Sequence, residues 1–147
     1  MKLKSIKRMQ RWKNMIFNST LALNILLLFL FIFDSRLHIP PWLQVVGRMH
    51  TMFLHFPIVM LALCIFWELF SGYKKSYVGV KAEIGDELLL AAAITSVITA
   101  LMGLFLSRED GYTADLLVWH KWGGVFISFL SLGWYVFLFG VTVAFSI

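Results

Sequence analysis

The sequence of 147 residues has few of the charged residues that keep a domain soluble in water, and almost no cysteine. Only 14% of its residues are charged, eight are acidic, and Cys64 is its single cysteine, which excludes an intrachain disulfide. Hydrophobic residues make up 60% of the chain and the mean hydropathy is +0.81, whereas soluble domains are roughly 45–50% apolar. The composition therefore excludes a soluble globular domain and predicts an integral membrane protein.

The long apolar runs also lack the alternation of polar and apolar residues that is typical of transmembrane β-strands. A membrane-spanning chain without a closed barrel must be helical, because every backbone polar group has to be satisfied within its own segment. About 17 or more apolar residues are needed for each crossing. Four runs reach that length, which predicts an all-α membrane protein and a single four-helix domain over residues 1–147, with spans at about 16–33, 47–71, 86–107 and 116–145.

No acidic residue precedes the first span, although six of the thirteen basic residues lie there: Lys2, Lys4, Lys7, Arg8, Arg11 and Lys13. Basic residues accumulate on the cytoplasmic side of membrane proteins. The pattern predicts that both termini are cytoplasmic, and it gives no support for nucleic-acid binding. A signal peptide is the alternative interpretation, but its apolar run is too long and no small-x-small cleavage site follows it.

Prolines are few, and they mark the second span. Pro40 and Pro41 are expected to stop helical structure in a short interfacial segment, with Trp42 at headgroup depth. Pro57 is expected to kink the span beside His55. In the third span, small residues recur on one face at steps of three and four, which predicts close approach of a neighbouring helix and room for a flat cofactor: Ala92, Ser96, Ala100 and Gly103.

Histidines are the main polar groups inside the spans. The topology places His50, His55 and His120, and also His38, in or near the extracytoplasmic half of the membrane. His55 and His120 lie within about one helical turn of the same depth. Two imidazoles on different helices of a bundle are what a b-type haem requires as axial ligands, so His55 and His120 are the predicted iron ligands.

His50 is about 140° around the helix from His55, so the two cannot readily bind one iron and His50 is expected to point elsewhere. It could bind a haem propionate, relay a proton or line a quinone site, and Arg48 and Lys121 could also meet propionates. The alternatives are hydrogen-bonded structural histidines or, with less support, a three-histidine zinc or copper site. Glu68, near the cytoplasmic boundary, could pair with a nearby lysine or serve a proton path.

These residues resemble a known family. Gly47-Arg-Met-His-Thr-Met-Phe-Leu-His-Phe-Pro57 and, later, His120-Lys-Trp-Gly-Gly124 are similar to the signatures of a bacterial membrane family, domain of unknown function 2231. The departures are Thr51, where the family has proline, and Lys121, where it has arginine. Members are sometimes joined to c-type cytochrome domains, which implies a redox setting. This chain has no CxxCH motif and so no covalent haem of its own.

We therefore expect a multi-pass protein of the bacterial inner membrane that carries haem b and serves electron transfer as a subunit rather than as a stand-alone enzyme. Its expected partners are the lipid bilayer, other membrane subunits or a c-type cytochrome, and a quinone. The alternative is a non-catalytic accessory or assembly subunit of a larger membrane complex.

Overall fold

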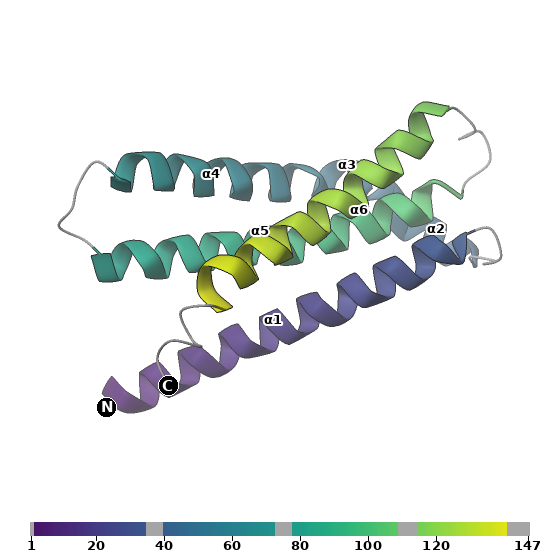
Figure 1. The fold of residues 1–147 in the computed structure, drawn as a ribbon. Helices are drawn as coiled ribbons and strands as arrows, with labels where there is room; N and C mark the ends of the chain where they lie inside the picture. The colour runs from purple at the N-terminus through teal and green to yellow at the C-terminus, as the bar shows by residue number, and fades with distance from the viewer. Residues whose placement is uncertain (1, 35–39, 73–77, 109–114, 141–147) are drawn as a thin grey trace.

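The computed structural model describes residues 2–34, 40–72, 78–108 and 115–140, which are almost entirely helical. Its elements are α1 (Lys2–Ile32), α2 (Pro41–Arg48), α3 (His50–Phe53), α4 (His55–Gly72), α5 (Val78–Leu106), α6 (Asp115–Tyr135) and a π-helical turn at Val136–Gly140 (Figure 1). Four helical stretches are long and apolar enough to cross a membrane, as predicted: Arg8–Ile32, Pro41–Phe70, Ile84–Leu106 and Leu117–Leu138.

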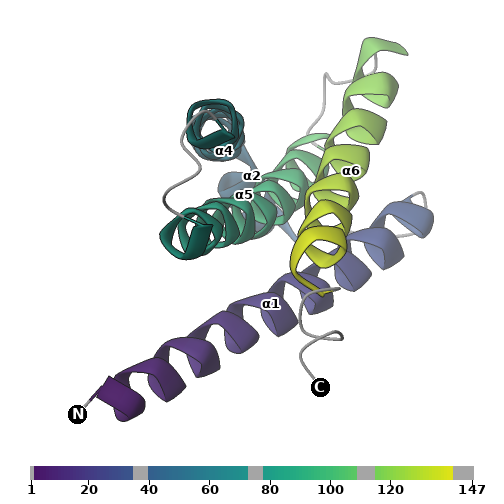
Figure 2. The same ribbon diagram turned by 60° about the vertical axis from the view of Figure 1, so that its left-hand side comes forward.

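Helix α5 is the centre of the bundle. It packs against α6 and α4 most extensively and also against α1 and α2, and Figure 2 shows it between α4 on one side and α6 and α1 on the other. Its small side chains make this possible, since Ala92 and Ala93 are fully buried and Ser96 nearly so. Small residues let helix backbones approach closely in a membrane, where lipid offers no hydrophobic drive for association.

The second span begins earlier than the sequence indicated. Helix α2 starts at Pro41, directly after Pro40, so the expectation that the two prolines stop helical structure is wrong. Proline suits the first helical position because its missing N–H would have no intrahelical partner there. Gly47 then brings α2 against the backbone of α5: a Cβ at Gly47 would lie 2.6 Å from the backbone nitrogen of Leu106.

The second span is interrupted at two places, Met49 and Leu54, which separate α2, α3 and α4. Pro57 lies just after the second interruption and cannot donate a hydrogen bond to the carbonyl of Phe53. The Thr99 hydroxyl of α5 lies 3.4 Å from that carbonyl oxygen and 2.8 Å from the carbonyl oxygen of Thr95. Its single proton goes mainly to the nearer Thr95, so Phe53 gains only a weak contact from α5.

Helix α1 is bound to the bundle by one face. On the face toward the bundle, Leu27 is fully buried in a core with Val97 and Val125. Asn24 is also buried, and its Oδ1 accepts a 2.9 Å hydrogen bond from Ser128 of α6. The opposite face of α1 remains exposed. Helix α1 is therefore a peripheral helix of the bundle that is bound through one apolar and polar face.

We predict that Asn24→Leu lowers the free energy of unfolding by about 0.6 to 2 kcal/mol, because it leaves the Ser128 hydroxyl without its interhelical partner. Unfolding in mixed micelles measures the change. Asn18→Leu is the matched control, since Asn18 is exposed on the same helix and its loss should not destabilise the bundle. Equal losses for the two variants would contradict the assigned role of Asn24.

Candidate functional site

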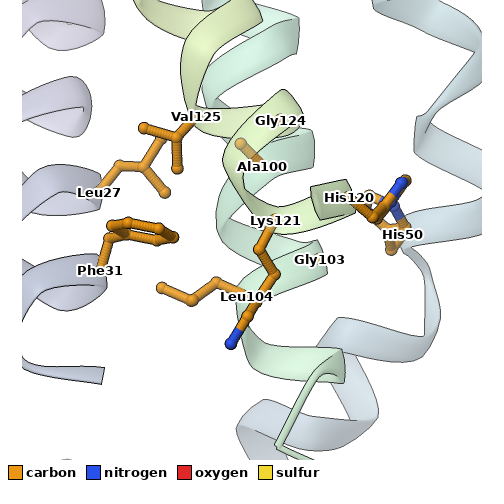
Figure 3. A pocket seen from close by; sticks show the side chains of 10 residues that line it. All are labelled: Leu27, Phe31, His50, Ala100, Gly103, Leu104, His120, Lys121, Gly124 and Val125. Atoms are coloured by element: carbon orange, nitrogen blue, oxygen red, sulfur yellow. The ribbon is translucent and has the colours of Figure 1, made fainter. Parts of the chain in front are cut away.

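Two histidines lie together at the end of the bundle that contains α2, α3 and the first turns of α6, which we call the histidine end. The ring of His50, in α3, is 5.8 Å from the ring of His120, in α6, between centroids, and the ring planes are perpendicular. Figure 3 shows the two side chains next to one another at one side of a cavity. His50 is only 8% exposed, whereas His120 is exposed.

The hydrogen bond of His50 defines which of its nitrogens can bind a ligand. Nδ1 lies 2.9 Å from the carbonyl oxygen of Thr99, in α5. A carbonyl only accepts, so Nδ1 carries the proton and Nε2 of the neutral ring presents a lone pair. Nε2 is buried and has no hydrogen-bond partner among the described residues. A histidine anchored to a carbonyl in this way is typical of metal ligands.

Gly103 provides the space for the His50 ring. A Cβ at Gly103 would lie 2.8 Å from Cε1 of His50 and 3.0 Å from its Nδ1. Any side chain there would displace the imidazole from the Thr99 carbonyl, one helical turn away on α5. The small-residue face predicted for the third span therefore accommodates a side chain from the second.

The structure brings His50 next to His120, whereas the sequence analysis paired His55 with His120. His55 is exposed, and its Nδ1 lies 3.1 Å from the carbonyl oxygen of Thr51 in the preceding turn. The prediction that His50 points away from the pair is wrong for the same reason. The five-residue spacing gives the angle between His50 and His55 around the helix axis, but it does not say which of the two side chains faces the bundle.

A signal for that direction was present in the sequence. Gly47, His50, Leu54, Pro57 and Leu61 follow one another at alternating steps of three and four, the spacing of a helix–helix seam. Gly47 and Pro57 are buried along with His50, so the seam faces α5. A glycine three residues before a histidine therefore indicated which of the two histidines enters the bundle.

The cation predicted at Lys121 is paired within the chain. Its Nζ lies 2.8 Å from Oδ2 of Asp34, at the end of α1, and Nε of Arg108 lies 2.7 Å from Oδ1 of the same carboxylate. All three side chains are between a fifth and about a quarter exposed. This cluster joins α1, α5 and α6 at the histidine end and has a net charge of +1. Arg48, the last residue of α2, also has an interaction of its own, and His38 lies outside the described residues.

Two spaces adjoin the histidine pair. The first is a cavity of about 30 Å³ between α1, α5 and α6, lined by Leu27, Phe31, Gly103 and both histidines and visible in Figure 3. Its volume is enough for about one water molecule. The second is a groove of about 360 Å³ between α4 and α6, which we call the histidine groove. Helix α5 forms its floor, and both histidines, Pro57 and Gly123 line it.

The histidine groove is large enough to take a ligand, since small-molecule sites are usually about 300–1,000 Å³. A three-histidine metal site is not formed, because within the described ranges no three His, Cys, Asp or Glu side chains gather at one point. The site is therefore a pair of imidazoles, one fixed and buried and one exposed, at the end of an apolar groove.

Fold and site define a helical protein with four potential membrane spans and a histidine pair between two of them. No family model matches the chain, and neither the curated proteins nor the solved structures contain a match to it.

We predict that Gly103→Ala displaces His50 and lowers the free energy of unfolding by about 1–3 kcal/mol through overpacking. In protein labelled with ¹⁵N-histidine, the NMR signal of the His50 Nδ1–H tautomer, assigned with His50→Gln, should shift or disappear. Gly123→Ala is the matched control, because a Cβ at Gly123 meets nothing within 4 Å. An unchanged His50 signal in Gly103→Ala would show that the glycine is not needed for the ring.

Proposed function

We propose that the protein is a membrane-embedded haem b carrier, an electron-transfer subunit in which His50 and His120 would hold the iron. The observation that carries the proposal is the buried Nε2 of His50, which has no partner among the described residues and belongs to a ring that packs against His120. A buried polar atom without a hydrogen bond costs free energy, and ligation of a metal would recover it.

The residues around the pair fit this role. The His50 and His120 rings have centroids 5.8 Å apart, so the two side chains are close enough that both could hold one iron. His120 is exposed, which leaves its ring room to rotate toward a ligand. The groove is lined on α5 and α6 by residues with little or no side chain: Ala100, Gly123 and Gly124. A flat macrocycle could therefore lie close to the backbones of these two helices.

The chain's own groups have distinct tasks in this proposal. The Thr99 carbonyl holds Nδ1–H of His50, which fixes the tautomer and increases the basicity of Nε2. Lys121 and Arg48 are the cations that could meet propionates, with Lys121 shared with Asp34. The apolar side chains of the groove exclude water. Haem, when bound, supplies a one-electron carrier whose potential responds to this environment.

The basic N-terminal segment supports an orientation with both termini in the cytoplasm. In that orientation the histidine end lies toward the extracytoplasmic side, where a c-type cytochrome could exchange electrons with it. No family model matches the chain, so the bacterial and cytochrome c setting is proposed from the resemblance of the histidine motifs alone. We infer a location in the bacterial inner membrane on these grounds.

The absorption spectrum of the purified protein, oxidised and dithionite-reduced, tests the proposal. We predict a Soret band and a shifted α-band on reduction, both lost in His50→Ala and in His120→Ala. His55→Ala is the matched control and should keep both bands, because His55 is exposed on the same span.

A protein without a Soret band after expression with adequate haem supply would overturn the proposal. Loss of the band in His55→Ala but not in His50→Ala would also do so, since it would restore the pairing that the sequence indicated. Copurification of a colourless protein with a large membrane complex would favour the accessory-subunit alternative, in which the His50–Thr99 hydrogen bond is purely structural.

A further inference from the structure

A second groove continues the histidine groove toward the opposite end of the bundle. It has a volume of about 450 Å³ and is again bounded by α4, α5 and α6. Leu61 and Ile127 line both grooves, so the two are contiguous. They exist because α4 and α6 both pack on α5 but have at most marginal contact with each other. We call this second space the glutamate groove, because Glu68 lines it.

The walls of the glutamate groove are mainly apolar, with a few polar groups at one side. Leu69, Leu89 and Leu130 supply hydrocarbon, and the indole of Trp134 supplies a flat surface. Ser131 donates its hydroxyl proton to the carbonyl of Ile127 at 2.8 Å, so its oxygen remains available as an acceptor. Apolar walls with a few convergent polar groups are characteristic of small-molecule sites.

Glu68 is the strongest of these polar groups. It lies on the same seam of the second span as His50, at steps of three and four through Leu61 and Cys64. The Glu68 side chain is exposed, and its carboxylate lies beside α5 at a glycine: a Cβ at Gly85 would lie 3.3 Å from Oε1. A carboxylate has lone pairs for about four hydrogen bonds, so it can accept one from a ligand in addition to its contacts within the chain.

These features select the chemistry of the ligand. It enters from the bilayer and must be lipid-soluble, it lies flat against an indole, and it brings a hydroxyl to a carboxylate. A lipid acyl chain offers no hydrogen-bond donor to the remaining acceptor sites of this carboxylate, whereas a ring hydroxyl does. We propose that the glutamate groove binds the ring of an isoprenoid hydroquinone, with Glu68 accepting a hydrogen bond from a ring hydroxyl.

This inference rests on the proposed redox function, because a quinol ring in the glutamate groove would lie next to the histidine groove, separated only by the shared Leu61 and Ile127. The residues of the glutamate groove would bind and position the quinol ring. The binding itself requires no haem, so the two proposals can fail separately.

The test uses the full chain in lipid nanodiscs and a hydroquinone with a ten-carbon tail, kept reduced under argon. We predict saturable binding by calorimetry. A photoreactive analogue of the hydroquinone, with an azide on its tail and both ring hydroxyls retained, should label residues of α4 and α6 that line the glutamate groove. Glu68→Gln should weaken binding about tenfold or more, because a charge-assisted hydrogen bond becomes a neutral one. Leu130→Trp, which fills the groove from an exposed position, should weaken it as well.

Glu87→Gln is the matched control. Glu87 is an exposed carboxylate on α5 that pairs with Lys13 at 3.5 Å and does not line the groove, so its loss should leave binding unchanged. His50→Ala should retain hydroquinone binding while it loses the Soret band. That result separates a failure of the haem proposal from a failure of this one.

Three outcomes would overturn the inference. The first is the absence of saturable binding. The second is binding that neither Glu68→Gln nor Leu130→Trp weakens, or labelling confined to other surfaces. The third is equal affinity for a ten-carbon alkylbenzene that lacks the ring hydroxyls, because the groove would then be a lipid-binding surface without selectivity for oxygen.

Discussion

The close contact between the second span and α5 is the constraint on which the rest of the structure depends. Gly47 brings the backbone of α2 against that of α5, and Gly103 accepts the His50 ring one helical turn further along α5. Glycine is needed at both positions because a single methyl group would lie within 3 Å of its neighbour. With lipid on the outside, close packing of this kind is the main source of attraction between spans.

The same contact determines the chemistry of His50. In a regular helix the carbonyl of Thr99 accepts the backbone N–H of Gly103 four residues later, and its second lone pair remains available. His50 Nδ1 occupies that lone pair at 2.9 Å. One residue pair of α5 therefore supplies both the space for the imidazole and the acceptor that fixes its tautomer. The outcome is a buried Nε2 that has no hydrogen-bond partner among the described residues.

The sequence was sufficient to predict four potential spans, because apolar runs of about 17 or more residues are typical of membrane-spanning helices. It was also sufficient to find the histidines. Two features could not be predicted from the apolar runs or from the depth of each residue along its span. Rotation about the helix axis decided that His50 rather than His55 meets His120, and only the glycine seam carried that information. The Asn24–Ser128 bond joins residues 104 positions apart, so no local pattern indicates it. The start of α2 at Pro41 was also not predicted, because a proline ends a helix in its interior but is favourable at its first position.

Both proposed binding regions lie along one face of the second span, which consists of α2, α3 and α4. Gly47, His50, Pro57, Cys64 and Glu68 lie on the seam that the second span presents to α5. Near the histidine end the seam is in contact with α5 through glycine, and beyond Pro57 it borders the grooves that separate α4 from α6. A bulky residue in place of Gly47 would separate α2 from α5 and so disturb the neighbouring His50 site. The two sites are therefore related through the packing of the second span on α5 rather than through any contact between them.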